Sequence, residues 1–203
     1  YFYALVGFSR CARVGPTTLI LTQTDWAGQT TTDSVNLSVT ATNFVVQAID
    51  LPPGKAGLLD ATLINKEEAQ VAALVGRYTP SRLWSGAFRQ PVYGAITSNF
   101  GTRRSYNGGR VGACGHEGTD FDEDAGVPVY ADARGRVVFA GLTQVRCNMV
   151  LVAHGLGIFT GYYHLSAIDV QVGQMVEAGG LVGKVGTTGL STGPHLHWSV
   201  WVN

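Results

Sequence analysis

Short runs of apolar and β-branched residues, each closed by a turn signal, recur along most of the chain and predict β-strands. In the first sixty residues these runs occupy residues 18–22, 34–39 and 44–49. Gly-Pro, Ala-Gly and Pro-Pro-Gly sequences separate them, and such residues favour tight turns. Short strands at this spacing are typical of a small antiparallel sandwich, so we expect an N-terminal β domain over residues 1–60.

One stretch has the pattern of a helix instead. Asn65 is expected to cap this helix, and Glu68 stands at its third position in a start that is similar to a capping box. Gly76 is the expected end of the helix. The apolar residues between these points are Ala69, Val71, Ala72, Leu74 and Val75. We therefore assign one short helix and a linker to residues 61–85.

The remaining part, residues 86–203, returns to short apolar runs and glycines. Buried strands are predicted at residues 137–140, 149–153 and 197–201. The expected fold class is therefore mainly β, with one helix in the connection between two β domains. The chain starts without Met and inside a predicted strand, so we expect that the N-terminal domain lacks residues upstream of Tyr1.

Composition and charge narrow the function classes. The chain has 27 glycines in 203 residues and is 45% hydrophobic, which fits a β fold with many tight turns and a packed core. Fourteen Lys and Arg balance 14 Asp and Glu, so the chain lacks the positive field that neutralises phosphates, and we expect no nucleic-acid partner. No run approaches the roughly 18 uninterrupted apolar residues of a membrane helix, so no membrane span is expected.

Three cysteines leave two interpretations open. Cys11, Cys114 and Cys147 form no Cys-x-x-Cys pair, which excludes a structural zinc knuckle. Cys114 and Cys147 fall in one predicted domain and can be bridged, with Cys11 left over; alternatively, all three are buried thiols. A bridge would indicate an oxidising compartment.

Four histidines and one aspartate are the candidate chemical groups. His195 and His197 lie two apart on a predicted strand and therefore project from the same face. His116 and Asp120 lie four apart, and His164 stands in a separate Tyr-Tyr-His-Leu sequence. A catalytic zinc site uses three nitrogen or oxygen ligands and keeps one position open for water. His116, Asp120 and His197 would supply such a set.

Four motifs frame these residues, in the order His116-x-Gly118-x-Asp120, Ala131-x-x-x-Gly135-x-Val137, Tyr162-x-His164-Leu165 and Gly186-x-Thr188-Gly189-x-Ser191-Thr192-Gly193-Pro194-His195-Leu196-His197. Together they resemble the lysostaphin-type (LytM, M23) zinc metallopeptidases over about residues 86–203. The resemblance implies an antiparallel β-sheet peptidase domain of the LytM type. It also implies one Zn²⁺ per chain on His116, Asp120 and His197, with His164 and His195 as catalytic residues beside the open position. Which of these two is the base stays open.

The same resemblance implies a substrate and a location. The substrate is the peptide part of bacterial peptidoglycan, and the location is extracytoplasmic: secreted, periplasmic or in the cell envelope. Residues 103–114 and 142–148 are expected to form loops along a groove. Tyr106, Asn107 and Tyr162 are the candidate substrate contacts.

The N-terminal region has a resemblance of its own. Residues 3–7, Tyr-Ala-Leu-Val-Gly, and residues 25–28, Asp-Trp-Ala-Gly, resemble parts of the immunoglobulin-like domain that precedes the peptidase in some bacterial members. This implies a domain without catalytic residues that positions the enzyme or covers its groove.

Two alternatives fit parts of the sequence. Some relatives are catalytically silent activators or cell-wall-binding proteins, but silent members lack the metal ligands that are present here. Residues 170–183 resemble the hairpin of biotin and lipoyl carriers, which need a lysine at an exposed turn. Lys184 is instead expected within a strand, so we interpret this likeness as shared β architecture.

Overall fold

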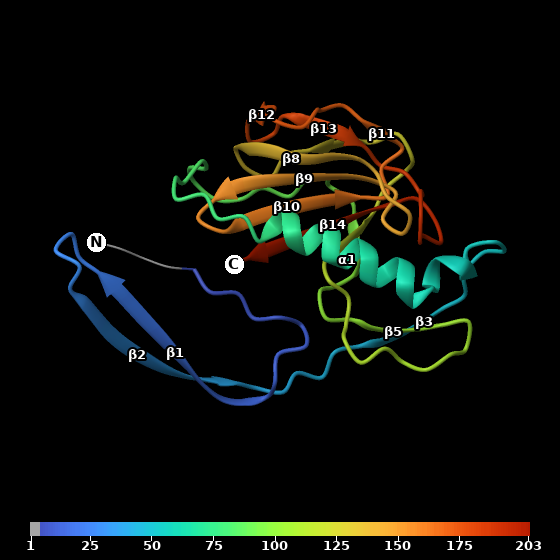
Figure 1. Cartoon of the computed structure of the whole chain (residues 1–203). Helices are drawn as coiled ribbons and strands as arrows, with labels where there is room; N and C mark the ends of the chain where they lie inside the picture. Colours follow the sequence, from blue (N-terminus) through green and yellow to red (C-terminus); the bar gives the residue numbers. More distant parts are fainter. Residues whose placement is uncertain (1–4) are drawn as a thin grey trace.

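A seven-stranded antiparallel sheet forms the body of the protein in the computed structural model, which describes residues 5–203 (Figure 1). The sheet consists of β4 (Ala95–Ser98), β6 (Thr119–Asp122), β8 (Gly135–Leu142), β9 (Asn148–Gly155), β10 (Ile158–Tyr163), β12 (Met175–Val176) and β14 (His195–Val202). Their order across the sheet is β12-β8-β9-β10-β14-β6-β4. The predicted mainly β fold with one α-helix is confirmed for the part of the chain that the structure describes.

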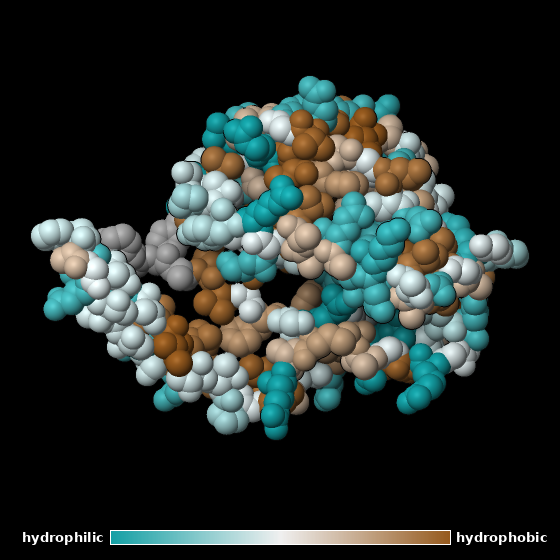
Figure 2. Space-filling view, viewed as in Figure 1, coloured by the Kyte–Doolittle hydropathy of each residue, from teal (hydrophilic) through white to brown (hydrophobic). Residues whose placement is uncertain are grey.

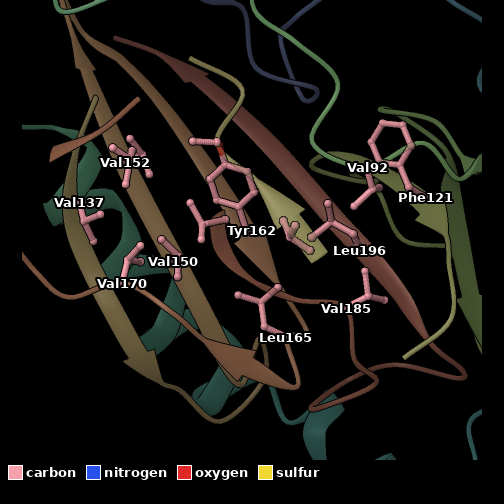
Figure 3. Packing of buried hydrophobic residues seen from close by; sticks show 14 residues of the cluster. Val92, Phe121, Val137, Val150, Val152, Tyr162, Leu165, Val170, Val185 and Leu196 are labelled. Atoms are coloured by element: carbon pink, nitrogen blue, oxygen red, sulfur yellow. The ribbon is translucent and has the colours of Figure 1, made fainter. Parts of the chain in front are cut away.

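Both faces of this sheet are buried, which explains the nearly continuous apolar run of β9. Val150 and Val152 belong to one buried cluster, whereas Met149 and Leu151 belong to a second one. Alternate residues of a strand point to opposite faces, so the two clusters lie on opposite sides of the sheet. The first cluster, shown in Figure 3, includes residues of a small sheet of β7 (Pro128–Tyr130), β11 (Ala167–Ile168) and β13 (Leu181–Lys184).

The second cluster is covered by α1 (Ala61–Val75), which follows a short 3-10 turn, η1 (Ala56–Leu59). Val71 and Val75 of the helix pack against β9 and β10, and Figure 1 shows the helix crossing this side of the sheet. The predicted cap at Asn65 is wrong. Asp60 caps the helix by accepting hydrogen bonds from the backbone N–H groups of Thr62 and Leu63, because an aspartate just before the first turn meets its free amides.

The predicted immunoglobulin-like sandwich over residues 1–60 is not confirmed. The described residues form a two-stranded hairpin of β1 (Gly15–Thr24) and β2 (Thr30–Val39), and Figure 2 shows it as an arm that stands clear of the body over much of its length. Most of its side chains are exposed on both faces. The next strand, β3 (Val46–Ile49), pairs in parallel with β5 (Arg103–Tyr106) of the predicted peptidase domain. Part of the motif at residues 3–7 lies outside the described residues.

A disulfide links Cys11 to Cys114, with their Cα atoms 5.3 Å apart. The suggested bridge between Cys114 and Cys147 is therefore wrong. Cys147 is a half-buried free thiol in the turn between β8 and β9, whereas the β3–β5 pairing draws the N-terminal segment toward the loop that ends at Cys114. Within residues 5–203, no helix combines the length and the apolar character needed to cross a bilayer.

Candidate active site

The three predicted metal ligands converge where β6 and β14 run side by side. His197 lies directly opposite Asp120 in this antiparallel pair, and His116 lies in the loop just before β6, which begins at Thr119. His197 Nδ1 lies 2.9 Å from Asp120 Oδ1, and His116 Nε2 lies 3.1 Å from the same oxygen. The two ring nitrogens are 2.8 Å apart. All three residues are buried, so sequence positions 81 residues apart form one compact cluster.

In each of the two imidazoles, the ring nitrogen that points away from the cluster determines which nitrogen carries the proton. These outer nitrogens are Nδ1 of His116 and Nε2 of His197. His116 Nδ1 faces the carbonyl oxygen of Asn99 at 3.3 Å, and a carbonyl can only accept. His197 Nε2 lies 2.8 Å from the hydroxyl of Ser199, which itself donates to the carbonyl of Glu117. Both outer nitrogens therefore carry the proton. The inner nitrogens, His116 Nε2 and His197 Nδ1, present lone pairs to each other and to the Asp120 carboxylate.

Three lone-pair-bearing atoms this close together fit a shared cation. These three ligand atoms form the one such group of His, Cys, Asp or Glu side chains among residues 5–203. The ligand atoms lie 2.8–3.1 Å from one another, somewhat closer than the roughly 3.3–3.6 Å expected for nitrogen and oxygen ligands at about 2.0–2.2 Å from a tetrahedral Zn²⁺. The donor set therefore suits one metal ion, with its outer nitrogens held by hydrogen bonds in the way that metal-binding histidines require.

Arg104 completes the surroundings of the aspartate. Its Nη2 donates to Asp120 Oδ2 at 2.5 Å and to the Ser98 hydroxyl at 2.9 Å. The second carboxylate oxygen is thereby engaged, which leaves Oδ1 to face the two imidazoles. Sequence reasoning placed residues 103–114 along a groove but did not single out Arg104, because no local pattern indicates that β5 reaches the end of β6.

His164 and His195 lie beside this cluster with their rings 4.9 Å apart. His164 follows the last residue of β10 with a positive φ of 60°, and its Nδ1 donates to the carbonyl of Thr188 at 2.8 Å. His195 begins β14, and its Nδ1 donates to the carbonyl of Gly193 at 2.9 Å. Both rings therefore keep an unprotonated Nε2, and that of His195 lies 3.9 Å from Asp120 Oδ1.

Burial keeps both of these rings neutral. Burial lowers the pKa of His164 well below its ordinary value, and the neighbouring His195 and His197 lower it further. The pKa of His195 is also lowered, mainly by burial, although the Asp120 carboxylate opposes that shift. Each Nε2 is thus available to accept a proton at neutral pH.

Two adjacent open cavities border the cluster, with volumes of about 230 and 270 Å³. They share Arg104, Tyr106, His164 and Leu190 as lining residues. The first also touches Val145 in the predicted loop at residues 142–148, and it extends to Ile64 and Glu68 of α1. The helix and β3 therefore contribute to the walls of the groove, and the first four residues of the predicted loop at residues 103–114 form the strand β5 instead.

The three predicted substrate contacts occupy different surroundings. Tyr106 lines both cavities. Asn107 lies in an exposed turn with a φ of 50°, and its side-chain oxygen accepts from the backbone N–H of Leu51 at 2.8 Å. Tyr162 is wrong as a substrate contact, because it is fully buried in the core and its hydroxyl donates to Asp132 at 2.6 Å. On β10 the neighbouring Tyr163 faces the metal cluster instead.

Gly118 is required by the close approach of β14. A Cβ at this position would overlap the backbone carbonyl of Trp198 and lie 2.8 Å from His197 Nε2. We expect Gly118→Ala to destabilise the protein by about 1–3 kcal/mol, the usual cost of overpacking, and to weaken metal binding because His197 must shift. Thermal unfolding and bound-metal analysis measure both effects. Gly57→Ala, where a Cβ has open space, is the control; equal metal binding in Gly118→Ala would contradict the prediction.

Comparisons with known proteins agree with this arrangement. The sequence profile of Peptidase family M23 matches residues 114–203. The chain is 31% identical over 198 residues to the peptidoglycan DD-endopeptidase ShyB of Vibrio cholerae, an alignment that covers 97% of this chain and 43% of ShyB. The crystal structure of a peptidase M23 from Pseudomonas aeruginosa superposes with a TM-score of 0.70 and 32% identity, over 97% of this chain and 71% of that one.

A second solved structure is that of a zinc-containing peptidase from Vibrio cholerae. It is 38% identical with a TM-score of 0.53, and the match covers 58% of this chain and 37% of that one. The chain spans less than half the length of the curated relatives that it matches.

Proposed function

The chain belongs to peptidase family M23, and from this membership we propose that it is a zinc-dependent endopeptidase that hydrolyses peptide bonds in bacterial peptidoglycan. The observation that carries the proposal is the convergence of His116, Asp120 and His197 on one point within 3.1 Å of each other. The name of the relative ShyB, a peptidoglycan DD-endopeptidase, supports the substrate class. Residues 86–203 form the peptidase domain in this proposal.

His116, Asp120 and His197 would hold the Zn²⁺. When bound, Zn²⁺ acts as a Lewis acid toward the scissile carbonyl and lowers the pKa of a water molecule. The complete ligand set favours a catalytic protein over the silent activator or wall-binding protein.

His164 and His195 act as the acid and base groups. Each offers a neutral Nε2, since the Nδ1 proton is held by a backbone carbonyl, of Thr188 for the first and of Gly193 for the second. One Nε2 accepts the proton of the attacking water, and the imidazolium then donates it to the departing amine. Tyr106, which lines both cavities, contacts the peptide in the groove.

An extracytoplasmic location follows from the substrate. Peptidoglycan lies outside the cytoplasmic membrane, and the Cys11–Cys114 disulfide is a bond that persists in oxidising compartments. Both observations support a protein that works in the periplasm, in the cell envelope or after secretion.

Digestion of purified sacculi tests the proposed activity. The zinc-loaded protein is expected to release muropeptides from sacculi of the Gram-negative or the Gram-positive type, and mass spectrometry of the products identifies the peptide bond that is cut. Treatment with a chelator should stop the release, and added Zn²⁺ should restore it. Protein with one Zn²⁺ per chain that leaves both kinds of sacculi and isolated cross-bridge peptides intact would disprove the proposal.

A further inference from the structure

Glu67 is a buried carboxylate on α1 that the sequence pattern did not single out. Its side chain is buried beneath the turn between β8 and β9. Oε2 accepts hydrogen bonds from the backbone N–H groups of Gln144 at 2.9 Å and Val145 at 2.8 Å. Oε1 accepts from the backbone N–H of Arg146 at 2.9 Å and from its guanidinium at 3.1 Å. Three successive amides therefore surround one carboxylate, in the manner of a backbone anion site.

The carbonyl groups of the same turn hold two segments beside the site: the one that carries His164 and the one that orients its ring. The carbonyl of Arg146 accepts from the backbone N–H of His164 at 3.3 Å. The carbonyl of Val145 accepts from the backbone N–H of Leu190 at 2.9 Å. Leu190 lies two residues after Thr188, whose carbonyl accepts the Nδ1 proton of His164. The turn thus fixes both the backbone of His164 and the group that orients its ring.

The guanidinium of Arg146 extends this support to a metal ligand. It is buried between Glu67 and Glu117, and it lies 5.5 Å from the ring centre of Tyr163. The Tyr163 ring stacks on the His197 ring, with centres 5.0 Å apart and planes within 4° of parallel. The His197 imidazole is therefore supported by the Tyr163 ring, which packs beside the Arg146 guanidinium, and Glu67 in turn holds that guanidinium.

We propose that Glu67 is a positioning residue for the peptidase reaction: by binding three amides of the β8–β9 turn and Arg146, it holds His164 in position for its acid–base role. This rests on the proposed function of the site. Although burial raises the pKa of Glu67, the hydrogen bonds from Val145 and Arg146 outweigh it and keep the pKa below its ordinary value, so the carboxylate stays charged at neutral pH. The family profile matches residues 114–203, so α1 lies outside the matched region. In this proposal α1 nevertheless supports the catalytic site.

Glu67→Gln is the decisive variant, because it keeps the shape of the side chain and removes one of its two acceptor oxygens. Its amide nitrogen must face donors, which leaves two of the four hydrogen bonds unmade. We expect kcat to fall by about 10- to 100-fold, the usual cost of losing an outer support of a site, with KM changed less than about twofold and Zn²⁺ content unchanged. Hydrogen exchange should become faster in residues 143–147 and 186–191.

Val71→Ala is the matched control. Val71 lies on the same helix and is equally buried, but it belongs to the apolar cluster that α1 covers, and its side chain cannot form hydrogen bonds to the β8–β9 turn. It should lower the unfolding temperature while leaving kcat and the exchange of both segments as in the wild type. Wild-type kcat in Glu67→Gln, or an equal loss of kcat in Val71→Ala at a matched loss of stability, overturns the proposal.

Two further measurements keep the test decisive. If Glu67→Gln does not fold, Glu67→Asp takes its place, and its shorter carboxylate should reduce kcat and speed exchange in the same two segments. Wild-type kcat in Glu67→Asp together with faster exchange would overturn the proposal. If the wild-type protein cleaves no peptidoglycan, the proposed function fails, but exchange in residues 186–191 still tests the inference, and unchanged exchange there overturns it.

Discussion

Replacement of His197 by alanine is expected to abolish metal binding and peptidase activity together. The change removes one of the three ligand atoms. It also takes away the imidazole whose Nδ1 lies 2.9 Å from Asp120 Oδ1 and 2.8 Å from His116 Nε2. Loss of an outer partner of a metal ligand already costs about 10- to 100-fold in affinity or activity, so loss of a ligand should cost more. Bound Zn²⁺ by mass spectrometry and turnover of muropeptides measure the two effects on one preparation.

Ser199→Ala gives the graded control for this experiment. It removes the hydroxyl that holds His197 Nε2 but keeps all three ligands, so Zn²⁺ should bind with an affinity lowered by about 10- to 100-fold and activity should return at high Zn²⁺. Stoichiometric Zn²⁺ or wild-type turnover in folded His197→Ala would contradict the assignment of His197 as a ligand.

His164→Ala is expected to give the opposite separation, with Zn²⁺ retained and turnover lost. His164 contributes no atom to the ligand cluster, and its Nε2 is free to take a proton because its Nδ1 donates to the Thr188 carbonyl. A positioned acid or base typically contributes about 10²- to 10⁴-fold, so kcat should fall by that factor. Zinc analysis and single-turnover kinetics on a defined muropeptide separate binding from chemistry.

His195→Ala should behave in the same way, and a comparison of the two variants identifies the base. The variant with the larger loss of kcat marks the histidine that takes the proton from water, and the other stabilises charge that develops in the transition state. A His164→Ala protein that loses its Zn²⁺ or turns over substrate at the wild-type rate would show that His164 does not have the role proposed for it.

The strands were predictable from the sequence, but their partners at the N-terminus were not. The runs at residues 18–22 and 34–39 do lie in β1 and β2, because β-branched residues and turn glycines act locally. The third strand pairs with β5, more than fifty residues away, and no local pattern specifies a partner at that distance. The helix start was misplaced for a smaller reason: Asp60 and Asn65 are both good caps, and only the structure shows which one meets free amides.

The candidate site was predictable where residues stand in dense motifs. His116, Asp120, His164, His195 and His197 lie together as the motifs predict. The error at Tyr162 comes from the two faces of a strand: it is separated from His164 by one residue, but β10 ends there and the positive φ of His164 breaks the alternation. Glu67, Arg104 and Arg146 could not be found, because each acts through a residue that is distant in sequence.

The Cys11–Cys114 disulfide has a consequence for the topology of the molecule. It joins positions 103 residues apart and so closes a covalent ring that contains the hairpin arm, α1 and β5. In the chain-entropy model, closing a ring of this size lowers the conformational entropy of the unfolded chain and so stabilises the folded protein by roughly 4–5 kcal/mol. His116, Asp120, His164, His195 and His197 all lie beyond the ring, on the tail that leaves it at Cys114. If a protease cut the backbone within the exposed hairpin arm, the N-terminal fragment would stay attached through the disulfide at Cys114. The C-terminal fragment would still include the candidate metal ligands, so the two fragments would remain one covalent molecule.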